Sequence, residues 1–432
     1  MFPFLTPVPL DIGQTAGVVL KAEERARAGN DVNAIETELA PTGRYDLLWD
    51  GGQNHFVALL APRVIGTYVT KTATIDEALV NPQSIADRDI FERPNKNPVA
   101  ALANGGFVLE LNRPRYRVTL NQFAAYGSIT TTALLQNQPW PGEGRPADPN
   151  PVIPSTTGAR LTLLFAQTQL GVPIRVSRHF AVTPFAEFNA FGGADDASRG
   201  VIALTTGPGG GVRLEARASK YDQFETVLGG GRIETTFQGD RQGAVIYRAV
   251  ATQSYRHWLS NRLSWQAAGG GTVGGDEING YTFFTLADTA LLYDTWGVPK
   301  IAPGAQPYGA FGGKNPRTQF GLVAKVEPWL DIFSGDLEQR AVGIGVANYS
   351  IGQVTVRGQI AAARVFGTPQ SVATYETVQG ETSLQYRFTP TLAADLGARL
   401  QYQSFTNAVR ISTIRQVAGF LTLTYSPVPA RL

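Results

Sequence analysis

The sequence predicts an all-β chain that forms a closed antiparallel transmembrane β-barrel of about 16–18 strands with a short N-terminal helix. Three observations lead to this fold class. Long runs of residues alternate between apolar and polar side chains. Charged residues are only 17% of the chain, against about 25% in soluble domains. No stretch approaches the ~20 apolar residues of a membrane-spanning helix.

The alternation is clear in residues 383–405, where two alternating runs flank a short turn as in a β-hairpin. Leu396 and Leu400 fall on one face of the second run, and Asp395 and Arg399 fall on the other. A soluble sheet would bury the leucine face in a core, whereas a membrane barrel turns it to lipid and keeps the polar face inside. The same division of faces recurs along the chain, which favours the membrane barrel.

The alternating runs number seventeen. They exceed the usual strand length of about five or six residues and are long enough to cross a membrane when tilted. Single-chain bacterial barrels have an even number of strands, so this count is expected to be wrong by one. The runs are residues 33–49, 55–69, 104–112, 116–127, 158–172, 180–192, 201–218, 222–237, 243–255, 260–273, 281–294, 317–331, 338–350, 353–366, 373–388, 392–405 and 412–425.

The N-terminal segment is expected to stand apart, so that residues 1–30 are irregular and helical and residues 31–432 form the barrel. Residues 15–28 favour a helix because Thr15 can cap it and Ala, Leu, Lys, Glu and Arg have high helix propensity. Two placements stay open: a helix beside the barrel mouth, or a plug inside the lumen. The first residues lack the basic and apolar regions of a signal peptide, so export would require a signal that has already been removed.

The connections between runs differ in length. Short turns on one rim and long loops on the other are the usual arrangement of membrane barrels. The short turns are Asp50–Asn54, Asn112–Pro114, Gly352–Gln353 and Thr389–Thr391, and the long irregular segments are residues 70–103, 128–157 and 295–316.

These features resemble a Gram-negative bacterial outer-membrane β-barrel of the porin-like kind. The resemblance covers about residues 31–426 and rests on hairpins such as Tyr386–Tyr402, IRVSRHFAVTPFAEF and YRHWLSNRLSWQAAG. It implies the bacterial outer membrane as location, contact with outer-membrane lipid, and a plug or periplasmic position for the N-terminal segment. One departure is that the last run stops at Tyr425 and is followed by SPVPARL, although such barrels usually end in an aromatic residue.

Few residues could support catalysis or hold a metal ion. Cysteine is absent, and the three histidines are His55, His179 and His257. All three lie beside short turns of one rim, and strands spaced ~4.8 Å apart separate them too widely for a shared metal ion. There is no GxSxG motif, and the GxGxxG match at Gly269–Gly274 is not followed by a helix. We therefore expect no enzymatic activity and no cofactor.

The best functional signal is the face opposite the leucines. If apolar residues face lipid, the inner face carries twelve bases and five acids. Such an excess would concentrate anions in a narrow channel, although Arg–Glu pairs across neighbouring strands could simply brace the wall. The hypothetical anion path is lined by Arg63, Arg117, Arg213, Arg217, Arg248, Arg262, Arg357, Arg387 and Arg399. Arg160, Lys325 and Arg415 complete the bases, and the acids are Glu187, Glu215, Glu327, Glu381 and Asp395.

Three functions remain open on these grounds. The first is an outer-membrane barrel that forms a passive channel for small polar or anionic solutes. The alternative is a conduit or anchor of a larger machine that exports polysaccharide or protein, closed when isolated and bound to a periplasmic or outer-membrane protein partner. The third is a soluble all-β protein, which would have to bury every apolar face. The net charge of +2 gives no reason to expect nucleic acid as a partner.

Overall fold

The computed structural model describes residues 14–29, 32–49, 54–72, 99–129, 161–200, 203–240, 242–276, 280–298, 317–330, 337–366, 374–406, 411–427 and 430–431. Arg160 and most of the three long segments predicted from the sequence lie outside these described residues.

Within these ranges, twenty-one strands form one sheet. They are β1 (Gln14–Gly29), β2 (Val32–Trp49), β3 (Asn54–Leu60), β4 (Arg63–Thr72), β5 (Val99–Asn112), β6 (Arg117–Ile129), β7 (Leu161–Gly171), β8 (Ile174–Ser177), β9 (Phe180–Gly193), β10 (Leu204–Arg217), β11 (Asp222–Thr236), β12 (Gln242–Trp258), β13 (Leu263–Asp276), β14 (Gly280–Asp294), β15 (Arg317–Leu330), β16 (Leu337–Ile351), β17 (Val354–Phe366), β18 (Thr374–Arg387), β19 (Leu392–Thr406), β20 (Ile411–Tyr425) and β21 (Ala430–Arg431). The helical elements are α2 (Asp196–Arg199) and η2 (Gln238–Asp240). In the described part of the chain, no helix has the length and apolar character needed to cross a membrane.

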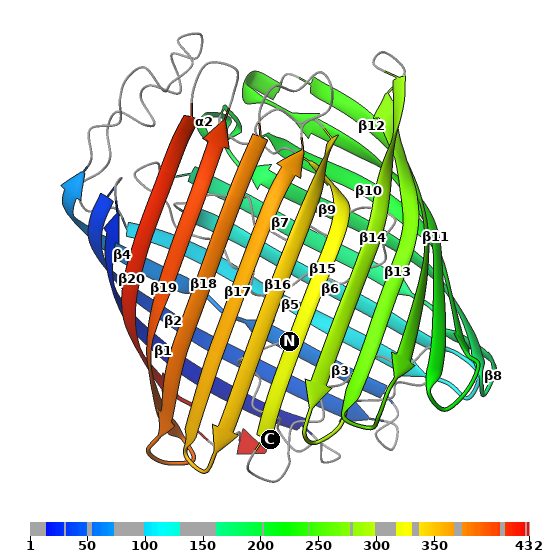
Figure 1. Cartoon of the computed structure of the whole chain (residues 1–432), viewed down its shortest axis with the longest axis horizontal. Helices are drawn as coiled ribbons and strands as arrows, with labels where there is room; N and C mark the ends of the chain where they lie inside the picture. The colour runs from blue at the N-terminus through cyan, green and yellow to red at the C-terminus, as the bar shows by residue number, and fades with distance from the viewer. Residues whose placement is uncertain are drawn as a thin grey trace.

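The sheet closes on itself into an antiparallel barrel (Figure 1). β3 and β4 are two parts of one wall strand, since both pair with β2 and β5. β7 and β8 share a wall strand in the same way, and β21 only adds a two-residue pairing to β1. The wall therefore has 18 strands. The closing ladder joins β1 to β20 from Leu20–Tyr425 to Gly29–Gln416.

The prediction of an N-terminal helix is wrong, because residues 14–29 form the wall strand β1. Its helix-favouring residues also alternate: Glu23 and Arg25 are turned inward, while Glu24 lies on the exposed outer face. β1 pairs with β2 on one side and β20 on the other. Without it the barrel would keep two open edges, which a membrane does not tolerate. This non-local pairing outweighs a local helix propensity of only tenths of a kcal/mol per residue.

The seventeen predicted runs each overlap a wall strand, and β1 is the strand that was missing from the count. The barrel domain predicted over residues 31–432 therefore leaves out one wall strand, since Gln14–Gly29 belong to the barrel. Strand order places the predicted short turns and the end of β20 on one rim, the turn rim. The other rim, the loop rim, receives the segments that follow β4 and β6, as predicted. One predicted long segment differs, because β14 ends and β15 begins at the turn rim.

The two faces of the wall differ in polarity. Large apolar side chains such as Leu396 and Leu421 are 63% and 47% exposed on the outer face. Polar and charged side chains such as Glu36 and Gln167 are buried on the inner face. The core of this protein is therefore its polar interior, the reverse of a soluble domain.

Glycines allow close strand packing in one part of the wall. A Cβ atom on Gly211 would lie 2.2 Å from the Leu228 carbonyl oxygen, and one on Gly270 would lie 2.1 Å from that of Ala251. The Gly-rich segments of β10, β11 and β13 thus serve close approach of neighbouring backbones, as strand glycines often do. This explains the GxGxxG match without a nucleotide.

Candidate functional site in the barrel interior

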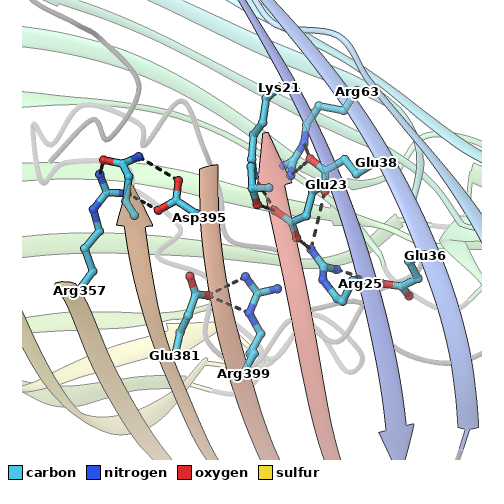
Figure 2. A network of polar contacts seen from close by, with 12 residues as sticks. Lys21, Glu23, Arg25, Glu36, Glu38, Arg63, Arg357, Glu381, Asp395 and Arg399 are labelled. Carbon is cyan, nitrogen blue, oxygen red and sulfur yellow. Dashed lines mark hydrogen bonds and ion pairs between the residues drawn. The ribbon is translucent and has the colours of Figure 1, made fainter. Parts of the chain in front are cut away.

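A charged network lines the inner wall where the barrel closes, on β20, β1, β2 and β4 (Figure 2). Glu23 is its centre. Its carboxylate accepts hydrogen bonds from Lys21 at 2.8 Å and from the Thr422 hydroxyl at 3.0 Å, and it forms an ion pair with Arg25. The contact with Thr422 joins the first wall strand to the last, so the network spans the closure.

The network continues across β2 to β4. Arg25 donates to Glu36 at 2.9 Å, and its other terminal nitrogen lies 3.8 Å from Glu38. Arg63 donates twice to Glu38, at 2.9 and 2.5 Å. All three carboxylates are buried and each faces at least one cation, so this part of the wall is nearly compensated in charge.

A second network lies on β17, β18 and β19 (Figure 2). Arg357 donates to Gln385 at 3.0 Å, and Gln385 donates to Asp395 at 2.9 Å. Arg399 donates twice to Glu381, at 2.8 and 2.6 Å. The Arg357 side chain is 38% exposed to the interior, so its charge stays available to solutes.

A third cluster joins β15 to β16. Glu327 accepts from Lys325 at 2.9 Å and from Arg340 at 2.5 Å. Arg340 is 2% exposed and Glu327 is 7% exposed. A buried pair of this kind fixes the geometry of the hairpin more than it contributes a field for solutes.

The structure distributes the nine predicted path residues over the wall and does not gather them at one point. Arg63, Arg357 and Arg399 belong to the two networks of Figure 2. Arg248 is buried and donates to Thr272 at 3.0 Å. Arg117 begins β6, Arg213 and Arg217 lie on β10, Arg387 ends β18, and Arg262 lies in the exposed turn after β12.

One basic residue was assigned to the wrong face. Arg415 is exposed on the outer wall, where its guanidinium lies over the Tyr402 ring at 5.8 Å. Gln416 and Ala418 on the same strand are buried on the inner side. The alternation near the start of β20 therefore runs one position out of step with the prediction.

Sequence reasoning also missed many inward charges. The omitted charges are of both signs and largely compensate one another, because missed cations such as Arg27 and Arg44 are paired with missed carboxylates on the same face. Buried inward acids outside the predicted set are Glu23, Glu36, Glu38, Asp46, Glu110, Asp294 and Glu338. Glu23 of β1 was hidden by the helix interpretation, although the alternation over residues 20–28 was available as a signal. The acids of β2 lie within the predicted run 33–49, whose faces the sequence reasoning did not assign.

Aromatic side chains line another part of the inner wall. Phe123 and Phe165 lie 5.4 Å apart between ring centroids, and Phe165 and Phe191 lie 6.3 Å apart, each pair in an edge-to-face arrangement. They come from β6, β7 and β9. The interior therefore has apolar as well as charged surface.

The three histidines lie at the turn rim, as predicted. His55 lies 3.5 Å from Asp46, and the His257 ring nitrogen lies 2.8 Å from Asp222. No group of three His, Asp or Glu side chains that could hold a metal ion occurs among the described residues.

A small polar motif stands at the loop rim. Ser198 donates its backbone N–H to the Asp195 side chain at 2.8 Å and so caps α2. Burial acts to raise the pKa of Asp195, but hydrogen bonds from Ser198 and Thr162 outweigh it and lower the pKa below the ordinary value. The Ser198 hydroxyl in turn accepts from the Thr162 backbone at 2.8 Å, which ties α2 to β7.

A closed barrel with an apolar outer face and a polar inner face is a transmembrane β-barrel. No protein-family model and no curated protein matches the chain. Solved structures with a similar overall shape include OpdQ of Pseudomonas aeruginosa, with 8% identity, TM-score 0.46 and coverage of 96% of this chain and 99% of that one. OpdK of the same organism, solved with vanillate, shows 13% identity, TM-score 0.43 and coverage of 96% and 98%. Similarity at this level does not extend to the solute or the mechanism.

Proposed function

We propose that this chain is a bacterial outer-membrane channel through which small polar solutes diffuse. The observation that carries the proposal is the reversed polarity of a closed wall of 18 strands. An apolar outer face requires lipid around it, and a polar interior gives water and polar solutes a path. No covalent step is needed, because the width and the field of the interior would set what passes.

The charge pattern supports only a weak preference for anions. Most inward arginines in the networks of Figure 2 face a carboxylate within 4.0 Å. Arg357 is the least compensated of them, since its partner Asp395 is as far as 3.8 Å away and more than a third of the Arg357 side chain is exposed. Local compensation of this kind leaves small residual fields, so we expect modest selectivity.

Planar-bilayer recording of the purified protein tests this function. The expected result is steady conductance with a small shift of the reversal potential toward the anion side in a salt gradient. A boiled sample is the control, because unfolding abolishes the barrel. Absence of conductance from folded protein, verified by a shift in gel migration on boiling, contradicts the proposal.

A second candidate is the conduit or anchor of a larger export machine. The observation that favours it is the deep burial of inward residues on the β15–β16 hairpin, including Trp329 and Arg340. A partly filled interior suits a barrel that opens only with a partner. Under this proposal the isolated barrel is silent in a bilayer and a periplasmic or outer-membrane protein co-purifies with it.

A further inference from the structure

One strand pair of the wall separates before it reaches the loop rim. The ladder between β14 and β15 runs from Asp294–Gln319 to Ala287–Val326 and ends there. The other edge of β14 stays paired with β13 up to Asp276–Gly280. β15 likewise stays paired with β16 up to Leu330–Leu337. We call the unladdered stretch, Gly280–Leu286 beside Glu327–Leu330, the β14–β15 split.

Proline accounts for the end of the ladder. Continued register would place Pro328 opposite Thr285, but proline has no N–H to donate to a neighbouring strand. The upper part of β15 curves away from β14 (Figure 1). Pro328 and Trp329 are almost completely buried there, and Glu327 is held by Lys325 and Arg340.

A side chain substitutes for the missing ladder at one point. The Gln339 amide of β16 donates to the Thr285 carbonyl at 2.9 Å and accepts from the Thr285 backbone N–H at 3.1 Å. Two side-chain hydrogen bonds thus connect β14 to β16 at the level of Pro328, two residues before β15 ends. Because lipid offers no hydrogen bonds to exposed backbone, these two bonds satisfy Thr285 where the ladder is missing.

The β14 edge of the split carries an aromatic side chain on each face of the wall. Phe283 is 66% exposed on the outer face. Its ring covers Gly271 of β13, since a Cβ atom added to Gly271 would lie 2.3 Å from the Phe283 ring. Phe284, the next residue, is 4% exposed on the inner face. Apolar surface therefore continues around the free edge of β14, from the interior to the outside.

Inside the barrel, the split leads to an apolar patch. Ile233, Ile246, Phe284 and Leu337 form one buried cluster contributed by β11, β12, β14 and β16. The Leu337 side chain also reaches β13. A Cβ atom added to Gly274 of β13 would lie 2.7 Å from the Leu337 Cδ1 atom.

A buried cation borders this patch. Arg248 lies two residues from Ile246 on the inner face of β12 and is 4% exposed. A basic group beside an apolar surface suits a molecule with an acidic head and an apolar chain.

We propose that the β14–β15 split is a lateral exit, through which a molecule with an apolar chain passes between the inner patch and the surrounding lipid. The exit opens when the Gln339–Thr285 contact breaks and the upper part of β14 separates from the β15–β16 hairpin. This exit is a second route, which leads from the barrel interior into the membrane and is separate from the aqueous path of the proposed function. It rests on the part of the proposed function that places the barrel in a membrane, but it does not require aqueous conductance.

Cross-linking across the split tests the exit. The chain contains no cysteine, so a Thr285→Cys/Gln339→Cys pair can be bridged selectively by a short bis-maleimide. The probe is labelled oleic acid, supplied to Gram-negative cells that lack a fatty-acid channel of their own. Unbridged protein should raise the uptake rate above that of cells without it, and the bridge should lower this gain by about tenfold, because exchange requires local opening.

The control pair is Thr289→Cys/Ala324→Cys, which joins β14 to β15 inside the intact ladder. Its bridge should leave uptake unchanged, and both bridged proteins should keep the bilayer conductance of the parent. Uptake that survives the Thr285–Gln339 bridge, or that never exceeds the background of cells without the protein, overturns the exit. If the bilayers show no conductance but the Thr285–Gln339 bridge still lowers oleic acid uptake, the aqueous channel is contradicted and the exit is not.

Discussion

Glu23 shows how single residues hold this barrel together. Its buried carboxylate contacts Lys21, Arg25 and Thr422, so one side chain links both strands of the closing ladder. Removing one member of such a cluster leaves its partners unpaired in a poorly solvated place, which costs more than an exposed ion pair contributes.

We expect Glu23→Gln to lower the free energy of unfolding by about 2–3 kcal/mol, because Lys21 and Arg25 lose a charged partner. The measurement is urea unfolding followed by heat-modifiable gel migration. Glu24→Gln is the control, since Glu24 lies next in sequence but contacts only Thr37 on the exposed outer face. Equal effects of the two substitutions would contradict a special role for the inner network.

Asp195 gives a prediction about pH. Its pKa in the folded protein is lowered, so its capping of α2 is fully present above the ordinary pKa of about 3.9. The contribution is lost as the pH falls through the lower, folded pKa. Amide protection at Ser198, measured by hydrogen exchange and corrected for intrinsic rates, should therefore decline in acid. Asp195→Ala should remove this dependence while Asp196→Ala keeps it.

At the scale of elements, each wall strand has a lipid face and an interior face. Register aligns Leu396 of β19 with Leu384 of β18 and Leu421 of β20, so the outer face is an apolar belt built across strands. The inner face of the same strands carries Glu381, Arg399 and Asp395.

Leu396→Arg is expected to destabilise the barrel by about 2–4 kcal/mol, since a charge then faces lipid. Ala361→Arg places the same charge on the inner face of β17, opposite Gln379, and should cost much less. Folding yield into lipid vesicles and urea midpoints measure the difference. If both arginines cost the same, the assignment of faces is wrong.

At the scale of the whole molecule, the field of the interior comes from charges on separate strands. Arg357→Glu changes the inner wall by two charges and should move the reversal potential of the channel toward cations. Arg364→Glu is the matched control, because Arg364 lies on the same strand, also has an acidic neighbour, and is 57% exposed on the outer wall. A shift of equal size in both variants would place the conducting path elsewhere.

The sequence by itself determined the fold class, the seventeen recognised strands and the face of most of their residues. These depend on the two-residue period of a strand, which is a local property that any stretch of sequence displays. The same period correctly placed Arg357 and Arg399 inside, and it failed for Arg415 where the alternation shifts by one position.

Only the tertiary structure decided the role of residues 14–29, the pairing of the inner charges and the split between β14 and β15. β1 carries the local propensity of a helix, yet it is a strand because it closes the ladder with β20. Glu23 and Thr422 meet only after that closure. The split likewise depends on Pro328 of β15 falling where a continued ladder would meet Thr285 of β14. Each of these results from register between distant segments, which local patterns do not encode.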